Sequence, residues 1–112
     1  MGTMIDELLL RDFLDSLGDS VILVEGRKDK AALVSWGVKE ENIVELKTGL
    51  SILETVEALS GQKDVVILTD MDRAGKGLRR RLLTMFGQYG ITEDKGPRDL
   101  FARLRLSHVE GL

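Results

Sequence analysis

VVILTDMDRAGKG, at residues 65–77, begins with apolar and β-branched residues and then places Asp70 and Asp72 one residue apart. A short, continuous apolar run is typical of a strand buried on both faces of a parallel sheet. Glycines and basic residues follow the aspartates at once. The stretch therefore predicts a buried strand that ends in two carboxylates and leads into a helix.

Apolar patterning on both sides of this stretch predicts alternating strands and helices. Strands are expected at residues 21–24, 43–46 and 65–69, and helices at residues 4–17, 27–36 and 73–87. Ser51 and Glu54 form a capping-box pattern that predicts one more helix ending near Gly61. The alternation predicts an α/β fold with a parallel sheet between helices.

The pattern weakens after Gly90. Pro97 is a suitable first residue for a short helix, and residues 108–112 are expected to form a last edge strand or to fray. The first helix, with its double apolar stripe, either covers the sheet or pairs two subunits, and the sequence leaves both arrangements open.

Composition limits the classes of protein that fit. The 112 residues are 43% hydrophobic, which suits a single domain spanning residues 1–112. No cysteine is present, so disulfides and thiolate metal sites are excluded, and a cytoplasmic location is expected. The net charge of -3 argues against nucleic-acid binding through bulk positive charge. No apolar run is long enough to span a membrane.

Carboxylates follow two of the expected strands. Glu25 ends the first strand, and Asp70 and Asp72 end the third. Ligands of open parallel sheets bind at the carboxyl ends of the strands, so these three side chains converge if the two strands are neighbours. Two unit charges ~4 Å apart repel by about 4 kcal/mol at an effective dielectric of ~20. A hard cation such as Mg²⁺, with its preference for oxygen ligands, would offset that repulsion.

The helix expected after Asp72 offers a site for the phosphate that such a metal recruits. Its first turn presents free N–H groups and the positive end of the helix dipole. Gly75 would allow a ligand to approach the backbone, and Arg73, Lys76 and Arg80 share one helix face. Simpler interpretations stay open: Asp72 could only cap the helix, and the basic run could be a solvated face. A late strand could bring His108 and Glu110 to the same rim, or His108 could be a terminal surface residue.

Two segments together resemble the Toprim family of topoisomerases, primases and ribonucleases. In VILVEGRKDKAAL, residues 21–33, Glu25, Gly26 and Asp29 match the family's Glu-Gly-x-x-Asp motif. In VVILTDMDRAGKGLRRRL, residues 65–82, Asp70, Asp72 and Gly75 match the Asp-x-Asp motif and its following glycine. The resemblance covers about residues 20–90.

This resemblance implies a three-layer α/β/α fold with a mostly parallel sheet of four strands, and Mg²⁺-dependent phosphoryl transfer on RNA or DNA, with Mn²⁺ as a substitute. Asp70 and Asp72 would hold the metal, and Glu25 would act as general acid or base or as a further ligand. Asp29 would assist a metal or pair on the surface with Arg27 or Lys30. The phosphate contacts would be Gly26, Arg27, Lys28, Arg73, Gly75, Lys76 and Arg80.

The chain also departs from the larger family members. Its one tyrosine, Tyr89, lies on an apolar helical stripe and is expected in the core, so a topoisomerase nucleophile is not indicated. A small nuclease, or a related catalytic domain, is the preferred interpretation. The alternative is a module that binds Mg²⁺ and nucleic acid or polyphosphate without turnover, working with a second copy or another protein. A phosphoacceptor domain ranks last, because its acidic pair would follow the first strand.

Overall fold

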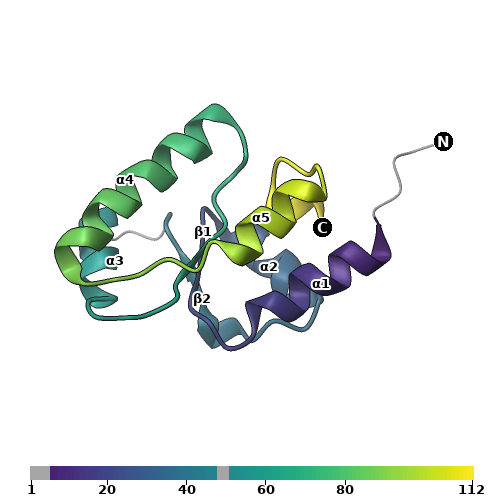
Figure 1. Ribbon diagram of the computed structural model, residues 1–112, viewed down its shortest axis with the longest axis horizontal. Helices are drawn as coiled ribbons and strands as arrows, with labels where there is room; N and C mark the ends of the chain where they lie inside the picture. Colours follow the sequence, from purple (N-terminus) through teal and green to yellow (C-terminus); the bar gives the residue numbers. More distant parts are fainter. Residues whose placement is uncertain (1–5, 48–50) are drawn as a thin grey trace.

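The computed structural model describes residues 6–47 and 51–112. Within these ranges, three strands form a parallel sheet in the order β2-β1-β3 (Figure 1). The strands are β1 (Ile22–Val24), β2 (Ile43–Glu45) and β3 (Val66–Ile67). Since β1 pairs with both of the others, the carboxyl ends of β1 and β3 are neighbours, which was the condition for the predicted convergence of their carboxylates.

The helices follow the expected order. They are α1 (Glu7–Leu17), α2 (Arg27–Ser35), α3 (Ile52–Ala58), α4 (Arg73–Tyr89) and α5 (Gly96–Arg103), with short 3₁₀ turns η1 (Glu40–Asn42) and η2 (Val109–Gly111). The predicted capping box at α3 is confirmed, because Ser51 Oγ accepts from Glu54 N and Glu54 Oε1 accepts from Ser51 N. Met4 and Ile5, included in the first predicted helix, lie outside the described residues.

Helices cover both faces of the sheet, which confirms the three-layer architecture. Successive residues of β1 point to opposite faces. Ile22 and Val24 pack in one core cluster with side chains of α1, α2 and α5, whereas Leu23 packs in a second cluster with those of α3 and α4. Tyr89 is half-buried against the second cluster, as expected for a residue that packs rather than reacts.

The outer edge of β3 differs from the expected four-stranded sheet. Among the described residues, a single parallel bridge between Val65 and Glu93 lies where a fourth strand would pair. The next outward-facing carbonyls of β3, those of Ile67 and Thr69, accept hydrogen bonds from Arg98 Nη1 at 3.1 and 3.0 Å. The side chain of Arg98 thus occupies the carbonyls that a longer fourth strand would use.

The C-terminal segment is not an edge strand, so that expectation was wrong. It forms η2, in which Val109 is fully buried in the first core cluster. Glu110 N donates to Asp29 Oδ1 at 3.2 Å and ties this turn to the start of α2. No helix of the described ranges is long and apolar enough to cross a membrane.

Candidate metal centre and its flanking pockets

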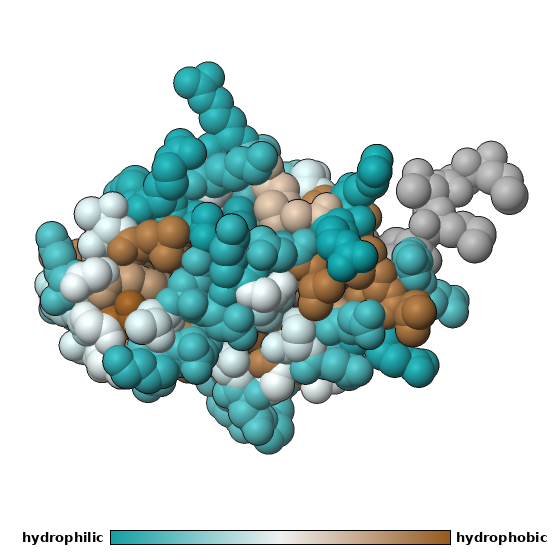
Figure 2. All heavy atoms as spheres, in the orientation of Figure 1, coloured by the Kyte–Doolittle hydropathy of each residue, from teal (hydrophilic) through white to brown (hydrophobic). Residues whose placement is uncertain are grey.

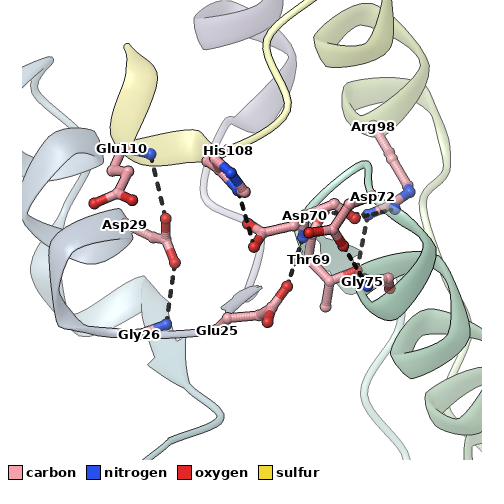
Figure 3. Close-up of polar contacts among 10 residues, drawn as sticks. All are labelled: Glu25, Gly26, Asp29, Thr69, Asp70, Asp72, Gly75, Arg98, His108 and Glu110. Carbon is pink, nitrogen blue, oxygen red and sulfur yellow. Dashed lines mark hydrogen bonds and ion pairs between the residues drawn. The ribbon is translucent and has the colours of Figure 1, made fainter.

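Two of the three strand-end carboxylates line one pocket, and Asp70 joins the third, Asp72, in a ligand cluster that does not include Glu25. Glu25 follows β1, Asp70 lies just beyond β3, and Glu25 Oε2 accepts a hydrogen bond from Asp70 N at 2.7 Å (Figure 3). Both line a pocket of about 270 Å³, named here the carboxylate pocket; its other residues are Gly26, Arg27, Lys28, Asp29, Lys47 and Glu110. The predicted convergence of the first and third strand ends is thus present.

Asp72 has two features that the sequence left as alternatives. Its Oδ1 accepts from Gly75 N at 2.7 Å, so the residue does cap α4. It also belongs to a cluster with Asp70 and His108, in which one ligand atom from each residue lies within 4.8 Å of the others. Since a carboxylate has two oxygens, capping and metal binding are compatible.

His108 is the residue that η2 brings to this cluster. Its Nδ1 lies 2.9 Å from Asp70 Oδ2, and its side chain is 43% exposed. The hydrogen bond that His108 donates to Asp70, with the charge of that carboxylate, raises the pKa of His108. The sequence left two interpretations of His108 open, a residue brought to this rim by a late strand and a terminal surface residue. The contact with Asp70 agrees with the first, although a 3₁₀ turn and not a strand brings His108 there.

Asp29 lies close by but has both oxygens engaged. Oδ2 accepts from Gly26 N at 3.1 Å and Oδ1 accepts from Glu110 N. Burial raises the pKa of Asp29, against the lowering effect of these hydrogen bonds. The residue is 7% exposed, and Lys30 pairs with Glu40 instead, so the proposed surface pair of Asp29 is not formed in the described structure.

Gly75 is required for a reason other than the expected ligand approach. A Cβ at this position would lie 2.1 Å from the backbone oxygen of Asp70. The glycine therefore lets the first turn of α4 pack directly on the Asp-x-Asp loop. Thr69 Oγ1 closes the same contact by donating to the Gly75 carbonyl at 2.8 Å.

The predicted phosphate-binding residues fall into two groups. Gly26, Arg27 and Lys28 line the carboxylate pocket. Lys76 and Arg80 line a second pocket, of about 280 Å³, between α4 and α5; we name it the basic pocket, and its other residues are Met71, Arg79, Lys95, Arg98, Asp99 and Ala102. Arg73 is exposed and lines neither of these two pockets.

Arg98 and Thr69 are the structurally important residues that the sequence did not single out. Arg98 is 6% exposed and donates to carbonyls of Ile67, Thr69 and Asp70. A usable signal exists for Arg98, which precedes the buried Phe101 by three positions and so shares its helix face. Thr69 carries no such signal. Threonine is a common strand residue, so its position at the end of a buried strand does not indicate a hydrogen-bonding role.

Comparison with known proteins finds relatives over most of the chain. The chain is 33% identical over 103 residues to a UPF0292 protein of Pyrococcus abyssi, covering 92% of this chain and 73% of that protein. It is 38% identical over 65 residues to the DNA primase DnaG of Thermoplasma volcanium, covering 58% of this chain and 14% of the primase.

A solved structure of a protein from Aquifex aeolicus has the same fold. It matches with a TM-score of 0.75 and 25% identity, over 94% of this chain and 95% of that one. The family model of the Toprim domain matches residues 20–104, a range that includes Glu25, Asp70 and Asp72. The chain therefore belongs to the Toprim domain family.

Proposed function

We propose that this protein carries out phosphoryl transfer on nucleic acid with a bound Mg²⁺ or Mn²⁺ ion, as a small nuclease. The cluster of Asp70, Asp72 and His108, with ligand atoms within 4.8 Å of one another, is the observation that carries the proposal. Membership of the Toprim family and the similarity to a DNA primase support it.

The side chains present fit a divalent ion. Asp70 and Asp72 offer carboxylate oxygens, the ligands that Mg²⁺ and Mn²⁺ prefer. His108 adds an imidazole nitrogen next to them, a donor that suits transition metals better than Mg²⁺. The donor set therefore favours Mn²⁺ more than an all-carboxylate set would.

The remaining residues of the carboxylate pocket have roles in handling substrate. Glu25 accepts from Asp70 N through Oε2, and its other oxygen would accept or donate a proton at the reacting group. Arg27, Lys28 and Lys47 line the same pocket and supply positive charge for phosphate oxygens. When bound, the ion would neutralise charge on the scissile phosphate.

Cleavage of labelled RNA and DNA strands with Mg²⁺ or Mn²⁺ tests this function. Glu25→Gln and Asp70→Asn should each lower the cleavage rate by about 100-fold or more, since each removes a charged group from the reacting centre. Asp64→Asn is the matched control, because Asp64 is an exposed acid at the opposite end of β3 and should leave the rate unchanged.

Two results would overturn the assignment. Undiminished cleavage by both variants would show that these carboxylates do not act. Metal-dependent binding of the strand by wild-type protein without any product would instead select the binding module, for which the acidic net charge and small size also argue.

A further inference from the structure

The basic pocket between α4 and α5 carries an excess of positive charge that the proposed chemistry does not use. Five cations line it, namely Lys76, Arg79, Arg80, Lys95 and Arg98, against one acid, Asp99. Arg79 forms an ion pair with Glu93, with Nη2 and Oε1 2.6 Å apart. The other four cations of the pocket do not take part in this pair. Figure 2 shows hydrophilic residues over the middle of this face, with apolar patches on either side, at the left beside α4 and at the right over α1.

Arg98 is the residue that makes this pocket unusual. It is only 6% exposed, yet among the described residues no carboxylate lies within ion-pair distance of it. Burial lowers the pKa of Arg98, and so does the neighbouring charge of Arg79, against the smaller raising effects of the carboxylates of Glu93, Glu25 and Asp70. A buried cation without an anionic partner has a desolvation cost that carbonyl contacts offset only in part.

The guanidinium also has donors to spare. It has five N–H groups, and its hydrogen bonds within the described structure come from Nη1 and Nη2, to carbonyl oxygens and the Thr69 hydroxyl. Nε donates to none of the described residues. A planar donor fork of this kind matches the oxygens of a phosphate, and the exposed Lys76 and Lys95 can add two point charges at the rim.

The basic pocket is connected to the candidate metal centre through the backbone. Met71, which lines the pocket, separates the two aspartates, and Arg98 Nη2 donates to the carbonyl of Asp70 at 3.3 Å. Figure 3 shows Arg98 and Glu25 approaching the Asp70 loop from opposite directions. A strand with one phosphate at the carboxylates is therefore placed to extend a further phosphate toward this pocket.

We propose that the basic pocket binds a second phosphate group of the nucleic-acid strand, through Arg98 at its floor and Lys76 and Lys95 at its rim. That the pocket binds a phosphate group is inferred from the residues of the pocket itself. That this phosphate belongs to a nucleic-acid strand rests on the proposed function. The pocket thereby sets where along the strand the reaction occurs.

A titration with inorganic phosphate in metal-free buffer containing a chelator tests the pocket alone. Backbone amide NMR signals of Met71, Arg79 and Ala102 should shift. The double variant K76Q/K95Q, which changes only exposed residues, should bind about tenfold more weakly or worse. R27Q/K28Q removes two cations from the carboxylate pocket, and the affinity that the signals of Met71, Arg79 and Ala102 report should stay at the wild-type value. Absence of shifts, or shifts confined to Gly26 and Arg27, would overturn the proposal.

A short single-stranded oligonucleotide, with and without a 5′-phosphate, identifies the source of the phosphate. Equal binding of the two strands would mean that an internal phosphodiester occupies the basic pocket. Stronger binding of the phosphorylated strand would mean that a terminal phosphate occupies it. Either result supports the proposal. Oligonucleotide binding that K76Q/K95Q leaves unchanged would overturn it.

A Mn²⁺ titration separates this proposal from the proposed function. Paramagnetic broadening at Asp70 and Asp72 should persist in K76Q/K95Q, because neither lysine belongs to the metal cluster. Absence of broadening in wild-type protein would overturn the proposed function and leave the phosphate titration as independent evidence for the pocket.

Discussion

The carboxylate pocket and the basic pocket adjoin the same Asp-x-Asp loop. Backbone N–H groups fix the acids on one side of this loop, and backbone carbonyls fix the buried arginine on the other. Glu25, Asp29 and Asp72 all accept hydrogen bonds from backbone N–H groups. Arg98 instead donates to backbone carbonyls at the outer edge and end of β3. Strand ends and helix N-termini both leave backbone groups without partners in a ladder or helix. The free N–H groups bind the acids and the free carbonyls of β3 bind the arginine.

Gly75→Ala should affect both pockets and have the largest effect. A Cβ 2.1 Å from the Asp70 carbonyl oxygen requires the loop or the helix to move, so the free energy of unfolding should fall by more than about 3 kcal/mol. Urea unfolding measures this. Gly77→Ala is the control, since the nearest atom to its Cβ would be the flexible end of Arg80 at 3.8 Å, and it should be neutral or stabilising. Equal effects of the two variants would contradict the close packing.

Arg98→Met should damage the basic pocket and the adjoining strand edge. The carbonyls of Ile67 and Thr69 lose their donor, and we expect a loss of about 3 kcal/mol in the free energy of unfolding. Arg103→Met, on an exposed position of the same helix, should change stability by less than about 0.5 kcal/mol. If Arg98→Met were as mild as its control, the guanidinium would not be replacing strand hydrogen bonds.

Asp29→Ala should act on the carboxylate pocket alone. It leaves Gly26 N and Glu110 N without their acceptor, but it also removes a buried charge, so the expected loss is about 2 kcal/mol. Hydrogen exchange at the Glu110 amide should accelerate. Asp19→Ala, which breaks an exposed ion pair with Lys39, should cost at most about 0.5 kcal/mol. A protected Glu110 amide in Asp29→Ala would contradict the tether.

His108→Gln should produce the smallest effect, and one that depends on pH. The pKa of His108 is raised in the folded state above its ordinary value of 6.5, so its stabilising contribution is full below that value and is lost as pH rises through the folded pKa. In metal-free buffer, wild type should exceed the variant in unfolding free energy at about pH 5.5 and match it at about pH 8.5. A difference independent of pH would contradict the contact with Asp70.

Local patterns in the sequence were sufficient for most of the fold. The apolar run before Asp70 and the capping box at Ser51 each depend on neighbouring residues, so both could be predicted. The convergence of Glu25 with Asp70 followed from one topological rule, that carboxyl ends of adjacent parallel strands share an edge.

Features that depend on distant backbone atoms could not be predicted. Arg98 binds backbone carbonyls. Since every residue has a backbone carbonyl, the sequence does not indicate which residues Arg98 contacts. His108 reaches Asp70 only because a buried Val109 and the Asp29 contact fix the η2 turn. Gly75 was correctly singled out but for a different reason, since the atom that approaches it belongs to the chain's own loop.

The guanidinium at the outer edge of β3 has a consequence for self-association. Unpaired edge strands are the usual sites at which sheets of separate molecules join and aggregate. Here an added strand would have to displace a buried cation from the carbonyls of Ile67 and Thr69 before it could pair with them. The same arginine that lines the basic pocket therefore also blocks growth of the sheet into a polymer along this edge.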